Sequence, residues 1–182
     1  MQKTIKNLIS LLLTATMLLS VFTVMSAQAA EVVASGTCGA DGDNLTWTLD
    51  EEGTLIISGN GEMSDYSYNT QPPYDKERIS KIVIGDGVTH VGNQAFRSCS
   101  NLREVSISES VNSIGDAAFM GCYSLPELVI PNGVEEIGNS AFNICFALSR
   151  IVFGPNVKKI GYEAFEGCFQ ITHMPFLVAA LI

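Results

Sequence analysis

An eight-residue motif, G-x-x-A-F-x-x-C, occurs four times in this 182-residue chain, always at the same spacing. The copies begin at Gly92, Gly115, Gly138 and Gly161, and these positions set the period of the repeat. Five further columns keep one residue class at the same period, and their first members are Ile82, Ile84, Val88, Val91 and Leu102. A fixed period of this length is typical of a solenoid, in which each repeat packs only against its neighbours.

The spacing inside one copy predicts its secondary structure. In the stretch LREVSIS, Val105 and Ile107 alternate with polar residues, which indicates a short strand with one buried face. In GDAAFMGC, Cys122 follows Phe119 by three residues and Ala118 by four, a helical spacing that lasts for about one turn. Each copy is therefore predicted to be a short strand, a turn and a short helical return. Such a copy loses too much backbone entropy to fold alone, so copies must stack.

The complete unit, L-x-x-V-x-I-x-x-x-V-x-x-I-G-x-x-A-F-x-x-C, resembles the type 5 leucine-rich repeat of the BspA-like bacterial surface proteins over about residues 80–176. This resemblance implies an α/β solenoid, a right-handed leucine-rich-repeat horseshoe with short parallel β-strands on its concave face and short helical turns. It also implies adhesion, including binding to proteins of the host extracellular matrix.

Residues 1–29 have the pattern of a secretory signal peptide. Two lysines precede the apolar run LISLLLTATMLLSVFTVMS, and the small residues Ala27 and Ala29 follow it. A retained membrane anchor is the alternative, since Leu8–Met25 nearly has the length of a bilayer span. The small-residue site favours cleavage after Ala29, so we expect a secreted or cell-surface protein with no stable membrane insertion.

Residues 30–79 are predicted to form an N-terminal β-hairpin cap and a loop. The stretches NLTWTLD and GTLIISG alternate apolar and polar residues on either side of a turn at residues 50–53, which predicts a β-hairpin. A solenoid needs a cover over its first repeat, and this hairpin with Trp47 is the candidate. The polar and aromatic segment GEMSDYSYNTQPPYDKE is predicted to be a loop that leads into the first repeat strand.

Residues 80–182 hold the four 23-residue copies and an incomplete fifth. The fifth copy starts at Ile171, places Met174 and Phe176 in the strand columns, and ends in the apolar run FLVAALI. We expect either a fragment of a longer repeat array or an uncapped apolar edge that permits self-association.

The composition is acidic, with ten Lys and Arg against nineteen Asp and Glu and a formal net charge of −9. Cleavage after Ala29 removes Lys3 and Lys6 and no acidic residue, so the net charge of the mature protein is −11. A domain of this charge repels phosphate, which argues against nucleic acid as a partner.

The four repeat cysteines, one in each copy of the motif, invite three interpretations. Metal ligands must converge on one point, whereas these cysteines are one solenoid turn, or about 4.8 Å, apart. Export favours disulfides, but parallel side chains hold the Cβ atoms about 5 Å apart, and a bridge needs about 3.5–4.5 Å. We therefore expect buried free thiols that act as small apolar side chains, with no metal and no cofactor.

Catalytic candidates are few. The histidines are His90 and His173, and His90 is predicted to face solvent without a fixed partner. Cys38, in the stretch SGTCG, is the one cysteine outside the repeats. The stretch ADGDN is similar to the start of a calcium loop, but Leu45 and Thr46 stand where that loop needs an oxygen ligand and a glycine. We therefore predict a protein that is not an enzyme and has no catalytic residue.

The outward face of the repeat strands is the remaining candidate site. It has one charged column and one mostly apolar column. The charged column contains Lys81, Glu104, Glu127 and Arg150. The mostly apolar column contains Val83, Ser106, Val129 and Val152. Solenoids usually bind protein partners on such a strip, and the alternative is that β-branched residues simply suit strands.

These observations predict a secreted or cell-surface protein that binds another protein or a cell-surface polymer, with host extracellular matrix as one candidate partner. The first alternative is a non-catalytic targeting module, or fragment, of a larger secreted enzyme or surface protein. The second is a structural element of the cell surface that assembles through its uncapped end.

Counting thiols tests the cysteine prediction. We expect five free thiols per chain when the mature protein is denatured without reductant and titrated with a thiol reagent, because the repeat geometry opposes bridging. A count of one or three would mean that bridges formed.

Overall fold

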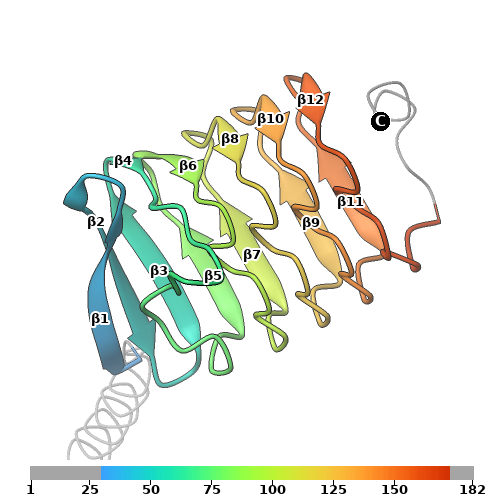
Figure 1. Cartoon of the computed structure of the whole chain (residues 1–182). Coiled ribbons are helices and arrows are strands. Elements are labelled where there is room, and N and C mark those ends of the chain that lie inside the picture. The colour runs from blue at the N-terminus through green and yellow to red at the C-terminus, as the bar shows by residue number, and fades with distance from the viewer. Residues whose placement is uncertain (1–29, 173–182) are drawn as a thin grey trace, which may run out of the picture. The chain divides into compact units, whose positions relative to one another are not determined.

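Stacked short strands build the main unit of this protein (Figure 1). The computed structural model describes residues 30–172, and the chain divides into the units Met1–Ala30 and Glu31–Ile182. Within its described part, the second unit is a β-solenoid of about five turns with parallel strands. The predicted signal peptide, His173 and the run FLVAALI lie outside the described residues. Nowhere in residues 30–172 is there a helix long and apolar enough to cross a membrane.

The strands are short, as the period-two patterns predict. They are β1 (Val32–Gly39), β2 (Gly42–Asp50), β3 (Thr54–Gly59), β4 (Gly61–Glu62), β5 (Lys81–Ile84), β6 (Val88–Val91), β7 (Glu104–Ile107), β8 (Ser113–Ile114), β9 (Glu127–Ile130), β10 (Glu136–Ile137), β11 (Arg150–Phe153) and β12 (Lys159–Ile160).

Each regular turn contributes one strand to each of two walls. The first wall contains the sheet β1-β2-β3-β5-β7 and the separate pair β9-β11. The second wall is the continuous sheet β4-β6-β8-β10-β12. Ile82 and Ile84 of β5 and Leu128 and Ile130 of β9 are buried, as predicted for the inward columns. In the same columns Val105, Ile107 and Phe153 are half-buried and pack against the core. A return segment closes each turn and carries the motif G-x-x-A-F-x-x-C.

The predicted short helical turns are not confirmed, because the return segments contain no helix anywhere in residues 30–172. Two positions of every copy have left-handed backbone, with φ between 52° and 77°. The first position is Gln94, Ala117, Ser140 and Glu163, and the second is Ser98, Gly121, Ile144 and Gly167. A left-handed residue stops a right-handed helix after one turn, and side chains at i, i+3 and i+4 still reach the core.

The left-handed residues turn the return segments into a third ladder of backbone hydrogen bonds. The N–H groups of Gln94, Phe96 and Ser98 donate to carbonyls of the next turn over 2.8–2.9 Å, and the later copies repeat this pattern. Phe96, Phe119 and Phe142 consequently stack with ring centroids 5.1 and 5.2 Å apart. All three side chains are fully buried, so this column is the centre of the core.

The N-terminal part adds strands that the sequence patterns predict only in part. β2 and β3 pair antiparallel with Trp47 opposite Ile57, which is the predicted hairpin. β1 also pairs antiparallel with β2, and this strand was not predicted. Because β3 pairs in parallel with β5, it belongs to the solenoid wall as well, and the role of the hairpin as a cap stays a prediction.

The segment between β4 and β5 completes an additional turn of the solenoid. The sequence predicts only a loop here, and residues 64–80 contain neither strand nor helix. Tyr74 nevertheless stacks on Phe96 at 5.8 Å between ring centroids, and its hydroxyl donates to the carbonyl of Ala95. Ile79 is buried one repeat period before Leu102, in the same column. The repeat pattern does not reveal this turn, because the A-F-x-x-C motif is missing from it. Tyr74 takes the place of the phenylalanine, and it lies 22 residues before Phe96 instead of 23.

The left-handed positions generate a stability prediction at Gly121. A Cβ atom added there would meet no atom closer than 3.6 Å, so a substitution strains only the backbone, whose φ is 76°. We expect Gly121→Ala to lower the free energy of unfolding by about 1 kcal/mol. Gly121→Asn should cost less, because Asn tolerates left-handed backbone. Urea titrations followed by circular dichroism measure both, and equal losses would contradict the assignment of the cost to backbone strain.

Candidate interaction face

The outward residues of β5, β7, β9 and β11, here called the strand face, occupy the positions that their alternation predicts. Val129 and Val152 leave 57% and 42% of their surface exposed. Glu104, Ser106, Glu127 and Arg150 are exposed as well, whereas Lys81 and Val83 are half-buried. Register places Lys81 beside Glu104 and Val83 beside Ser106. It also places Glu127 beside Arg150 and Val129 beside Val152.

The strand face is not one continuous sheet. The strands β5 and β7 belong to one sheet and β9 and β11 to another, because β7 and β9 are not paired. Arg103 and Ser108 flank β7 and donate their backbone N–H groups to the preceding turn over 2.8 and 3.1 Å. The equivalent positions around β9 are Pro126 and Pro131, which have no N–H to donate. Two missing donors at the ends of a four-residue strand account for the break.

A recess of about 260 Å³ lies at this break in the strand face. Glu104 and Val105 line it from the β7 side, and Pro126, Glu127 and Val129 line it from the β9 side. Val105 is only half-buried here, whereas the equivalent residues of the neighbouring turns are buried. Three of the predicted partner-binding residues therefore surround a hollow with an apolar floor.

The charged column of the strand face neutralises itself. Lys81 Nζ lies 2.7 Å from Glu104 Oε1, and Arg150 Nη1 lies 3.3 Å from Glu127 Oε2. These pairs are exposed, so each contributes about 0–1 kcal/mol to stability. The ion pairs matter mainly for binding. They leave the apolar column beside a strip without net charge, although the whole chain is acidic.

The apolar column also continues onto β3, beyond the four strands in which the sequence predicts it. Ile56 is paired in register with Val83 and is exposed. The sequence indicates that Ile56 points outward, since it lies between the inward residues Leu55 and Ile57. Its place in the strand face could not be recognised without the parallel pairing of β3 with β5.

The cysteine column is part of the core. All five cysteines are buried and carry free thiols, so the predicted burial is confirmed. The thiols of Cys122, Cys145 and Cys168 donate to the carbonyls of Phe96, Phe119 and Phe142 in the preceding turn, over 3.2–3.4 Å. This bond explains why a small weak donor occupies the column. No group of three or more His, Cys, Asp and Glu side chains is placed to hold a metal ion within the described part of the chain.

Comparison with known proteins agrees with this architecture. Residues 73–179 match the family described as "BspA type Leucine rich repeat region (6 copies)". The chain belongs to the BspA-type leucine-rich repeat family. Proteins with this repeat are typically non-catalytic and serve as interaction modules. No curated protein matches the chain.

Two solved structures are similar to this BspA-type chain. A leucine-rich repeat protein from Bacteroides ovatus ATCC 8483 has 31% sequence identity and a TM-score of 0.54 over 64% of this chain. The leucine-rich repeat protein of T. pallidum has 22% identity and a TM-score of 0.57 over 70% of this chain, a likeness of fold alone. The chain spans 35% of the length of the first protein and 66% of the second.

His90 is not the free surface histidine that the sequence analysis predicts. Its Nδ1 lies 2.8 Å from Ser113 Oγ, and its Nε2 lies 3.7 Å from Asp65 Oδ1. The histidine is half-buried because the loop that carries Asp65 lies beside it. No cysteine is near enough to form a hydrogen bond with His90 among those the structure describes, so these contacts hold the first turns together rather than activate a nucleophile.

Burial also makes the thiols of Cys38 and Cys99 poor nucleophiles, which generates a labelling prediction. Burial raises the pKa of Cys38 to about 11 and that of Cys99 to about 12. At pH 8 roughly one Cys99 thiol in ten thousand is then a thiolate. We expect Cys38 and Cys99 of the native protein to resist iodoacetamide at pH 8 for hours, and the urea-denatured protein to react at all five cysteines within minutes. Rapid labelling of native Cys38 or Cys99 in mass spectra would contradict this expectation.

Proposed function

We propose that this chain is a secreted or cell-surface leucine-rich repeat protein that binds another protein or a cell-surface polymer through its strand face. One observation carries the proposal. Val129 and Val152 are adjacent in register and expose 57% and 42% of their surface, although neither contributes to the core. Apolar side chains grouped in this way gain free energy when a partner covers them, at about 25 cal/mol per Å².

The surroundings of the two valines support the proposal. The recess between β7 and β9 begins beside Val129 and offers a place for a partner side chain. The ion pairs Lys81–Glu104 and Glu127–Arg150 form a rim in which charges are already compensated. A partner that covers this rim leaves no charge buried without a partner, and that avoids the largest penalty of burying charged groups.

The partner class follows from the charge and from the family. A mature chain with a net charge of −11 repels nucleic acid and anionic surfaces, and an uncharged or basic protein surface suits it better. Adhesion to proteins of the host extracellular matrix is implied by the BspA-type resemblance and is the candidate that we put forward first. A protein of this kind is not an enzyme, and its predicted signal peptide exports it.

A second candidate is a targeting module within a larger secreted protein. The chain spans only 35% of the length of the similar Bacteroides ovatus protein, which favours this candidate. Both candidates use the same face, and they differ in what the interaction delivers to the cell surface.

Aspartate substitutions on the strand face test the proposal. The probe is a panel of purified extracellular-matrix proteins, each immobilised separately, with residues 30–182 as the soluble analyte in surface plasmon resonance. We expect the double variant Val129→Asp, Val152→Asp to weaken binding at least tenfold, because two charges would be buried against the partner. The thermal midpoint should stay nearly unchanged, since both side chains are exposed.

The chain offers a matched control for this experiment. Val32 and Val33 of β1 expose 55% and 44% of their surface, close to the values of the two test valines, and lie at the other edge of the wall. The variant Val32→Asp, Val33→Asp should bind as the unmodified protein does. Equal weakening in both double variants would show that the added negative charge, and not its position, weakens binding. Unchanged binding in the Val129→Asp, Val152→Asp variant would show that the strand face is not the binding site.

A further inference from the structure

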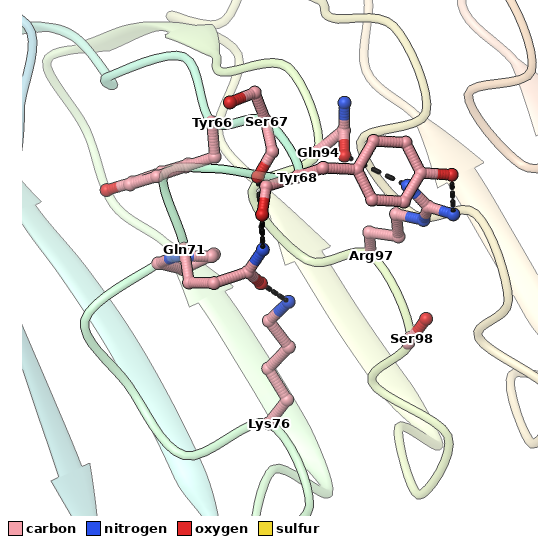
Figure 2. A pocket seen from close by; sticks show the side chains of 9 residues that line it. Tyr66, Ser67, Tyr68, Gln71, Lys76, Gln94, Arg97 and Ser98 are labelled. Atoms are coloured by element: carbon pink, nitrogen blue, oxygen red, sulfur yellow. Dashed lines mark hydrogen bonds between the residues drawn. The ribbon is translucent and has the colours of Figure 1, made fainter.

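A pocket of about 230 Å³ lies away from the strand face, on the side of the return segments (Figure 2). One wall comes from residues 66–76, in the loop of the first turn, and the other from residues 94–98, in the return segment of the next turn. The labelled side chains converge from these two segments, with Lys76 reaching toward Gln71 and Arg97 lying under the ring of Tyr68. No residue of the strand face lines this pocket.

The pocket exists because the first turn is longer than the others. Leu55 is paired in register with Ile82, and Ile82 is paired in the same way with Val105. The chain between the first two residues is longer by four positions than the chain between the second two. The additional residues project from the wall of the solenoid and form a compact turn. In that turn the Ser67 N–H donates to the carbonyl of Thr70 over 3.0 Å, and Gln71 Nε2 donates to the carbonyl of Ser67 over 3.1 Å.

The pocket holds two cations and no acidic side chain. Elsewhere in the described residues, four basic side chains form ion pairs with glutamates, and they are Lys81, Arg150, Lys158 and Lys159. Lys76 and Arg97 instead have neutral partners, and both are half-buried. In a chain with nineteen acidic residues and ten basic ones, a pocket lined by two cations without a carboxylate is a local exception.

Neutral contacts fix the two cations without cancelling their charge. Arg97 Nη1 donates to Gln94 Oε1 over 3.0 Å, and Nη2 donates to the hydroxyl of Tyr68 over 2.8 Å. The guanidinium carbon lies 4.5 Å from the centre of the Tyr68 ring. Lys76 Nζ donates to Gln71 Oε1 over 3.1 Å. A guanidinium has five N–H donors and an ammonium has three, so both groups keep donors for a ligand.

We propose that this pocket binds the carboxylate group of a small polar ligand of sugar-acid type, held by Arg97 and Lys76. A carboxylate accepts paired hydrogen bonds from a guanidinium and a further bond from an ammonium. Gln94 accepts from Arg97 through its Oε1, so its Nε2 is left to donate to a hydroxyl group of the ligand. A singly charged ligand fits better than a phosphate, because the acidic chain repels a doubly charged ion more strongly.

Calorimetric titration with glucuronate tests the proposal on residues 30–182. We expect saturable binding to the unmodified protein, weakened at least tenfold by Lys76→Met and weakened by raising the salt concentration. Arg97→Lys keeps the charge and removes the planar fork, and it should weaken binding as well. Lys159→Met is the matched control, since it removes a cation that pairs with Glu136 outside the pocket, and it should leave binding unchanged. Circular dichroism and the thermal midpoint check that each variant folds.

Two further ligands identify what the pocket recognises. Glucose has the sugar hydroxyls without the carboxylate, and binding of glucose as tight as that of glucuronate would overturn the proposal. Acetylglycine presents a carboxylate like that of a peptide end, and its binding with the same dependence on Lys76 and Arg97 would support the carboxylate site and assign it to peptide ends. Absence of saturable binding by both carboxylates, or equal binding by the folded Lys76→Met variant, would also overturn it.

Discussion

Backbone hydrogen bonding between successive turns is the constraint on which the rest of this structure depends. Each turn lies against the same part of the next, so its strands pair in parallel and its return segment forms a third ladder. The third ladder requires left-handed residues at two positions of every copy, because a helical return would use its N–H groups within the turn. Once the ladders set the spacing between turns, phenylalanine and cysteine side chains fall into register and fill the core.

Two departures from this regularity create the surface features that distinguish the chain. Pro126 and Pro131 remove the donors that would join β9 to β7, and a recess opens in the strand face. Four additional residues in the first turn produce the second feature, a pocket that carries Lys76 and Arg97. A solenoid with perfect repeats presents identical columns along its length, so a specific ligand is more readily recognised where the repeat is interrupted.

Charge is organised by the same stacking. Residues one period apart lie side by side, so lysine or arginine in one turn meets glutamate in the next, as in Lys81–Glu104 and Lys158–Glu135. These pairs reduce the effect of an acidic composition on the strand face and on the neighbouring wall. Lys76 is different because it occupies the column of Cys99, one period earlier, on a turn whose altered spacing carries the residue outward to the pocket.

The sequence alone determined the period, the inward and outward columns, the hairpin pairing of β2 with β3 and the burial of the cysteines, because each depends on a local pattern that repeats. The periodicity of GDAAFMGC was misleading, since a left-handed residue and a helix place Ala118, Phe119 and Cys122 on the same side. Only the tertiary structure decided that residues 54–79 form another turn, that the strand face is interrupted beside Val129, and that Arg97 meets Tyr68 from 29 residues away. These features depend on hydrogen bonds between residues of different turns, and no local pattern in the sequence predicts which groups will form them.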